Sequence, residues 1–152
     1  MPVFRDERRV RHNAVQMFDL VADVERYPEF VPLCKALRVR SRRLDASGRE
    51  TLVADMTVGY KLIRETFTSR VALDKANFKL RVEYIDGPFS RLENIWTFKD
   101  EAEGEGSRVC FFIDYEFKSR TLGMLMGSMF DAAFRKFASA FEQRADAVYG
   151  RS

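Results

Sequence analysis

The spacing of apolar residues changes once along this chain of 152 residues, and that change limits the folds it can form. From residue 33 to residue 118 apolar and polar residues alternate, as in strands that bury one face. From Leu122 to Val148 apolar residues recur every three or four positions, as on one face of a helix. The sequence therefore predicts a long antiparallel sheet followed by one long helix that ends at Gly150.

Turn signals divide the alternating region into six strands. They are segments 45–48, 59–60, 74–77, 86–88 and 103–106, in which Gly, Asp, Asn and Pro gather. Residues 3–11 are predicted to form an earlier strand, which makes seven, and short loops favour antiparallel pairing of neighbours. We expect a single α+β domain over residues 1–152.

A short helix is predicted between the first two strands. Asn13 and Gln16 have the spacing of a capping box at its start. The helix must end near Pro28 and Pro32, because proline removes a backbone donor and restricts the residue before it.

The predicted last helix, of about 28 residues, would be roughly 42 Å long, enough to cross the concave face of the sheet. A twisted sheet that curls around such a helix leaves space in the middle. Glu65, Ser69 and Asn94 are polar members of inward rows that are otherwise apolar. Either a bulge returns Glu65 to solvent and Asn94 bonds a nearby backbone group, or all three face a cavity, where Ser69 and Asn94 can donate to a ligand carbonyl.

The predicted ligand-binding residues lie on the inward rows and on the last helix. They are Met56, Glu65, Phe67, Ser69, Tyr84, Asn94, Trp96, Phe111, Tyr115, Met126, Met129, Phe130 and Phe137. The mouth of the cavity is predicted at Tyr27, Pro28, Phe30 and Pro32, together with the Met-rich segment 122–130, which would meet a membrane or a second copy of the chain. Simple core packing of that segment is the alternative.

The composition favours binding over catalysis. The chain has fourteen Phe, five Tyr and one Trp but only one His and two Cys. We therefore expect no nucleophile–base pair, no metal site and no cofactor that takes part in a reaction. No apolar run reaches the roughly 18 residues of a membrane span, and the charged N-terminus does not resemble a signal peptide. A cytoplasmic location is expected.

The formal net charge of +3 is too small to indicate nucleic-acid binding by itself. Arg38, Arg40 and Arg42 are predicted to share one face of a strand, where they can contact phosphates. The alternative is a solvated strand that uses charge to prevent aggregation.

Several segments resemble one known family. They are Asp23-Val24-Glu25-Arg26-Tyr27-Pro28-Glu29-Phe30-Val31-Pro32-Leu33-Cys34, Gly87-Pro88-Phe89, Trp96-Thr97-Phe98, Tyr115-Glu116-Phe117-Lys118-Ser119 and the ending Ala140-Phe141-Glu142-Gln143-Arg144-Ala145 with Tyr149-Gly150. Together they are similar to the coenzyme-Q-binding START-like proteins, which belong with the polyketide cyclase/dehydrase-like proteins and have the bacterial ribosome-association toxins among their relatives. Many members carry Trp where this chain has Leu33.

The resemblance implies a helix-grip fold with an apolar tunnel between sheet and helix. It also implies that the chain binds ubiquinone or another polyprenyl lipid and supports respiration, either in the cytoplasm or peripherally at the inner membrane. The alternative that it implies is a toxin that binds the large ribosomal subunit through Arg38, Arg40 and Arg42.

Overall fold

The computed structural model describes residues 3–60, 62–101, 104 and 106–150. Seven strands form one sheet in which all pairs are antiparallel, in the order β1-β7-β6-β5-β4-β3-β2. The elements are β1 (Val3–Val10), α1 (Ala14–Ala22), the 3-10 helix η1 (Val24–Glu29), β2 (Cys34–Leu44), β3 (Glu50–Tyr60), β4 (Ile63–Asp74), the 3-10 helix η2 (Lys75–Asn77), β5 (Lys79–Asp86), β6 (Phe89–Asp100), β7 (Ser107–Phe117) and α2 (Arg120–Tyr149). The predicted helix-grip architecture is confirmed.

Local sequence signals account for the helix boundaries. Asn13 accepts a hydrogen bond from the Gln16 backbone and the Gln16 side chain accepts one from Asn13 N, so the predicted capping box is present. The helix it caps ends at Ala22, earlier than the prolines alone require, and η1 covers the remaining residues up to Glu29. Gly150 is the C-cap of α2, as predicted.

The turns between strands agree closely with the predicted segments. The turns after Leu44, Asp74 and Asp86 fall where Gly, Asn and Pro indicate them. The turn predicted at Gly59-Tyr60 lies later in the chain, because both residues still belong to β3. In the predicted turn 103–106, residues 103 and 105 lie outside the described part of the chain.

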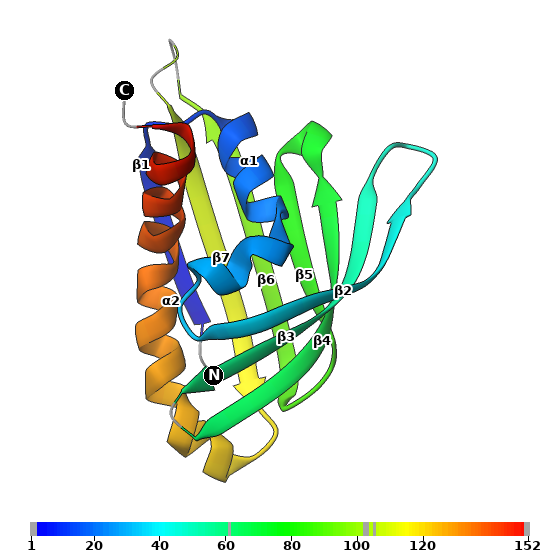
Figure 1. Cartoon of the computed structure of the whole chain (residues 1–152), viewed down its shortest axis with the longest axis vertical. Helices are drawn as coiled ribbons and strands as arrows, with labels where there is room; N and C mark the ends of the chain where they lie inside the picture. The colour runs from blue at the N-terminus through cyan, green and yellow to red at the C-terminus, as the bar shows by residue number, and fades with distance from the viewer. Residues whose placement is uncertain (1–2, 61, 102–103, 105, 151–152) are drawn as a thin grey trace.

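The long helix α2 does not sit over the centre of the sheet. It packs mainly against β1 and β7, while the start of β2 and the hairpin between β3 and β4 bend across the front of the sheet toward it (Figure 1). The contacts that fasten its C-terminal half include His12 Nε2 to Asp146 Oδ1 at 2.8 Å and the ring of Phe30 on that of Phe141. The core therefore lies between the concave face, α1 and α2, and a space is left beside β3 to β6.

A β-bulge reverses the orientation of residues along β2. Arg38 pairs with Asp55 on the convex face, but the register shifts between Val39 and Ser41, and Arg42 pairs with Leu52, which is buried on the concave face. The prediction that Arg38, Arg40 and Arg42 share one face is therefore wrong. Simple alternation cannot reveal an inserted residue.

Candidate functional site: an apolar cavity

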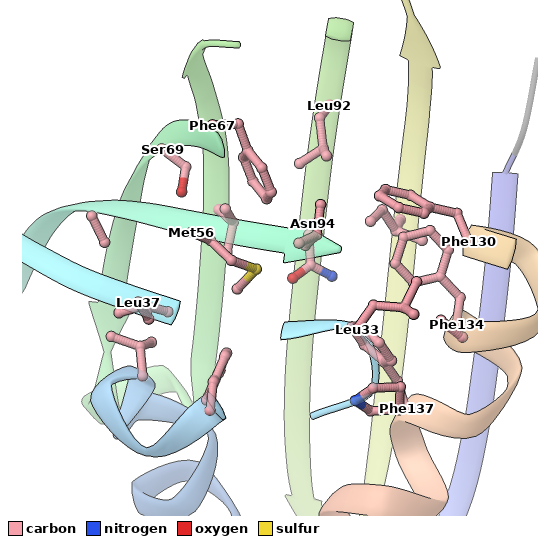
Figure 2. A pocket seen from close by; sticks show the side chains of 18 of the residues that line it. Leu33, Leu37, Met56, Phe67, Ser69, Leu92, Asn94, Phe130, Phe134 and Phe137 are labelled. Carbon is pink, nitrogen blue, oxygen red and sulfur yellow. The ribbon is translucent and has the colours of Figure 1, made fainter. Parts of the chain in front are cut away.

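A cavity lies between the concave face of the sheet and α2, and Figure 2 shows its walls. The residues that line it are Val24, Tyr27, Pro32, Leu33, Leu37, Ala54, Met56, Val58, Phe67, Ser69, Val71, Val82, Phe89, Leu92, Asn94, Trp96, Ile113, Phe130, Ala133, Phe134, Phe137 and Phe141. It offers about 90 Å³ to the centres of water-sized molecules, where one water needs roughly 10–15 Å³. A small ring therefore fits, while a long tail would have to leave through the opening.

The sheet contributes one wall, and its inward rows stay in register apart from irregularities between Thr68 and Ser69 in β4 and between Phe89 and Arg91 in β6. Pairs such as Met56 with Phe67 and Val82 with Asn94 place neighbouring side chains on the same face. Figure 2 shows Phe67, Ser69 and Asn94 projecting from β4 and β6 into the same space.

The helix contributes an aromatic wall. Phe130, Phe134, Phe137 and Phe141 follow at steps of four, three and four residues, which keeps them on one face of α2. Their rings contact one another and rings of the sheet. For example, the centroids of Phe134 and Phe137 are 5.1 Å apart.

The segment from η1 into β2 closes a third side. Leu33 lines the cavity with a backbone φ of 66°, a left-handed conformation that is unusual for leucine, and its carbonyl accepts a hydrogen bond from Gly59 N at 3.0 Å. Tyr27 turns its ring to the cavity and donates its hydroxyl proton to Val21 O. Burial raises the pKa of Tyr27 well above its ordinary value, so this hydroxyl stays protonated.

Nine of the predicted site residues are in the cavity wall. They are Met56, Phe67, Ser69, Asn94, Trp96, Phe130 and Phe137, and from the predicted mouth Tyr27 and Pro32. Asn94 combines the two predicted arrangements. It lines the cavity, and its Nδ2 also donates to the backbone oxygen of Phe112 at 2.8 Å.

Six predicted binding residues lie outside the cavity wall. They are Glu65, Tyr84, Phe111, Tyr115, Met126 and Met129. Glu65 shares the inward row of β4 but lies near the start of the strand, beyond the cavity. The Tyr84 hydroxyl accepts a hydrogen bond from Phe89 N. Phe111 and Tyr115 lie on β7, where α2 packs directly on the sheet and fills the space.

The predicted mouth is corrected by the structure. Phe30 packs on Phe141 and under the guanidinium of Arg144, while the Met-rich segment begins at Leu122. At 1.5 Å per residue the Met-rich segment 122–130 lies roughly 16 to 28 Å from Phe141 along α2. Neither Pro28 nor Phe30 lines the cavity, whereas Tyr27, Pro32 and Phe130 do.

Sequence reasoning did not select Leu33, Leu37, Phe89, Phe134 and Phe141 as site residues. Phe134 and Phe141 belong to the helical apolar pattern, so the pattern could have found them. Leu33 and Leu37 could not be found, because they reach the cavity only through the path of the chain after η1.

Comparison with known proteins adds to this geometry. Residues 10–142 match a family described as polyketide cyclase / dehydrase and lipid transport. The chain is 32% identical over 149 residues to the ribosome association toxin RatA of Escherichia coli, covering 98% of this chain and 90% of that protein. It is 31% identical over 139 residues to the coenzyme Q-binding protein COQ10 homolog B of Xenopus laevis, covering 90% of this chain and 54% of that longer protein.

Two solved structures with the same fold are more distant in sequence. A START superfamily protein of Mycobacterium smegmatis superposes with a TM-score of 0.78 at 18% identity, covering 96% of this chain and 98% of that one. The Zhui aromatase/cyclase of a Streptomyces species superposes with a TM-score of 0.74 at 16% identity, covering 95% and 93%. At these identities the likeness concerns the fold alone.

Proposed function

Because the chain belongs to the polyketide cyclase / dehydrase and lipid transport family, we propose that it binds ubiquinone or another polyprenyl lipid in the cavity and acts as a quinone-binding protein or chaperone that supports respiration. The observation that carries this proposal is the cavity wall. Of its 22 residues, none is Asp, Glu, Lys, Arg, His or Cys.

Apolar burial is sufficient to hold such a ligand. Each 100 Å² of apolar ligand surface that is buried offers about 2.5 kcal/mol at roughly 25 cal/mol per Å², before the costs of binding are subtracted. The cavity has room for a small ring, and the name of the Xenopus laevis relative describes coenzyme Q binding.

The same wall supports binding without catalysis. General acid-base chemistry needs a titratable group beside the substrate, and the one such group among the described lining residues, the Tyr27 hydroxyl, is committed to Val21 O. The aromatase/cyclase that shares the fold carries no argument for activity, because a fold does not imply a function.

The proposal is tested by extracting lipids from the purified protein and identifying them by mass spectrometry. Ala133→Phe fills the cavity from α2, and Ala132→Phe places the same ring on the exposed side of the neighbouring residue. We expect lipid in the wild type and in Ala132→Phe, and a loss of at least tenfold in Ala133→Phe. Repeated absence of lipid, together with no binding of added ubiquinone, would contradict the proposal.

Peripheral membrane contact is part of the proposal. Leu62, at the β3–β4 hairpin, is 100% exposed and Met124, in the first turns of α2, is 84% exposed. Both segments lie at the same end of the molecule (Figure 1), where Arg64 and Arg120 are exposed and can attract anionic lipid. Among the described residues, no helix is both long and apolar enough to cross a bilayer.

Sedimentation with vesicles tests this contact. Leu62→Ser and Met124→Ser should each weaken binding to anionic phosphatidylglycerol vesicles. Leu44→Ser is the control, because Leu44 is also highly exposed but lies at the β2–β3 hairpin. An equal effect of all three substitutions would exclude a defined docking end.

A toxin that binds the large ribosomal subunit is the second candidate, favoured by the RatA relatives over nearly their full length. The arginines of β2 support it weakly. Arg40 pairs with Asp55 at 2.7 Å and Arg42 with Glu25 at 2.6 Å, which lowers their availability to phosphates. Sucrose gradients after overexpression test it, and unchanged association of the ribosomal subunits would dismiss it.

A further inference from the structure

Four polar side chains interrupt the apolar wall of the cavity. Tyr27 is satisfied by Val21 O, which leaves Ser69, Asn94 and Trp96. We propose that these three residues bind an uncharged ligand head that carries oxygen atoms on two separate sides, such as a quinone or a hydroxylated or methoxylated ring. This inference rests on the proposed function and deepens it.

Ser69 is 5% exposed, and its hydroxyl makes no hydrogen bond to any described residue. Among the described residues, every side-chain nitrogen or oxygen atom that is inaccessible to solvent has a hydrogen-bond partner. The Ser69 oxygen has no such partner, so it must border open space, and Ser69 lines the cavity. Figure 2 shows it pointing there. A ligand oxygen is a partner that Ser69 can either donate to or accept from.

Asn94 has unused hydrogen-bonding capacity beside Ser69. Its Nδ2 donates one proton to Phe112 O at 2.8 Å, and because a carbonyl can only accept, this bond fixes the orientation of the amide. One N–H and the Oδ1 acceptor remain, and Figure 2 shows the amide projecting into the cavity.

Trp96 supplies a donor on the same strand. It is 2% exposed, and its indole N–H bonds to no acceptor in the described part of the chain. Trp96 lines the cavity, and its nitrogen is not sealed from open space. An indole N–H can only donate, so its ligand partner must be an acceptor such as an oxygen.

Spacing favours separate ligand atoms for Ser69 and Asn94, because the Asn94 amide bonds Phe112 O on β7, on the side away from β4. Ser69 on β4 and Asn94 on β6 are separated by β5, which places their backbones roughly 10 Å apart across two strand spacings. A ring-sized head with polar atoms on two sides fits this arrangement. A carboxylate or phosphate head is disfavoured, since none of the described residues that line the cavity carries a charge to compensate for its desolvation.

Two probes separate the head from the tail in titration calorimetry. Decylubiquinone carries the oxygenated ring, and decylbenzene carries a tail of the same length on a ring without oxygen. The wild type should bind decylubiquinone at least tenfold more tightly. Trp96 is the only tryptophan in the chain, so quenching of its fluorescence by the quinone reports directly on occupation of the cavity.

Ser69→Ala and Asn94→Leu should each weaken binding of decylubiquinone by roughly three- to tenfold and change binding of decylbenzene less than twofold. Ser69→Thr keeps the hydroxyl and should restore the affinity. The controls are Ser139→Ala on α2 and Asn77→Leu in η2, which remove the same groups outside the cavity, and thermal unfolding verifies that each variant folds.

The outcomes distinguish this inference from the proposed function. Equal affinity of the wild type for both probes, or equal weakening of both by the substitutions, overturns the assignment of the three polar residues and leaves lipid binding intact. Failure of both probes to bind the wild type overturns both proposals.

Discussion

The indole of Trp96 and the ring of Phe141 meet edge to face, with centroids 4.9 Å apart and planes at 69°. Trp96 lies on β6 and Phe141 on α2, and both line the cavity, so this contact closes the cavity where sheet and helix meet. Phe141 also contacts the rings of Tyr27 at 5.4 Å and Phe30 at 4.9 Å. One helical side chain thus joins the sheet, α2 and η1.

Phe141→Ala should lower the free energy of unfolding by about 3–5 kcal/mol, because it removes a buried ring and leaves a void. Chemical denaturation measures the change. Phe112→Ala is the control, since Phe112 lies on the outer face of β7 under Arg5 and is only partly buried. A cost for Phe141→Ala no larger than the cost of the control would show that this junction does not hold the helix.

Two glycines with nearly equal φ angles allow the cost of backbone strain to be measured separately from the cost of a steric clash. Gly48 has φ +86° and open space around it, and Gly106 has φ +87° with Val10 O only 1.9 Å from where a Cβ would lie. Gly48→Ala should cost about 1 kcal/mol through left-handed strain alone. Gly106→Ala should cost several times more or prevent folding, as measured by soluble yield and melting temperature. Equal costs would show that β1 moves away freely.

Burial, and secondly the charge of Asp131, raises the pKa of Tyr115 to about 12. As the pH rises from about 10 to about 12 the unfolded chain loses the phenol proton while the folded chain keeps it. The stability present below pH 10 is therefore lost across this window. Tyr115→Phe should lose about 2 kcal/mol less than the wild type between pH 9 and pH 12 in urea denaturation. Parallel stability curves for the two proteins would refute the assignment.

Burial also raises the pKa of the Cys34 thiol, to about 11. Because the thiolate is the reactive form, Cys34 should react slowly with iodoacetamide near neutral pH, and its rate should rise about tenfold per pH unit up to pH 10. A Cys110→Ala protein isolates the Cys34 reaction. A rate that levels off near pH 9 would indicate an exposed thiol instead.

The sequence predicted the elements well because their signals are local. Alternation on β4 to β7, the capping box at Asn13 and the C-cap at Gly150 depend on neighbours within a few residues, and all three are confirmed. The family resemblance is confirmed too, by the match over residues 10–142.

The membership of the site was harder to predict. Inward orientation placed Ser69 and Asn94 correctly, but it could not separate Trp96, which lines the cavity, from Phe111, which α2 covers. Whether an inward residue meets a cavity or a helix depends on where the helix lies, and no periodicity reports that position.

The sequence alone therefore determined the seven strands, the long helix and the mostly apolar, ring-rich character of the concave face. The tertiary structure decided that α2 lies toward β1 and β7, so that the cavity lies beside β3 to β6, and that a bulge in β2 turns Arg42 away from Arg38. The physical reason is that side-chain alternation follows from the backbone of each strand. The space between sheet and helix follows instead from contacts between residues far apart in the chain, such as Trp96 with Phe141.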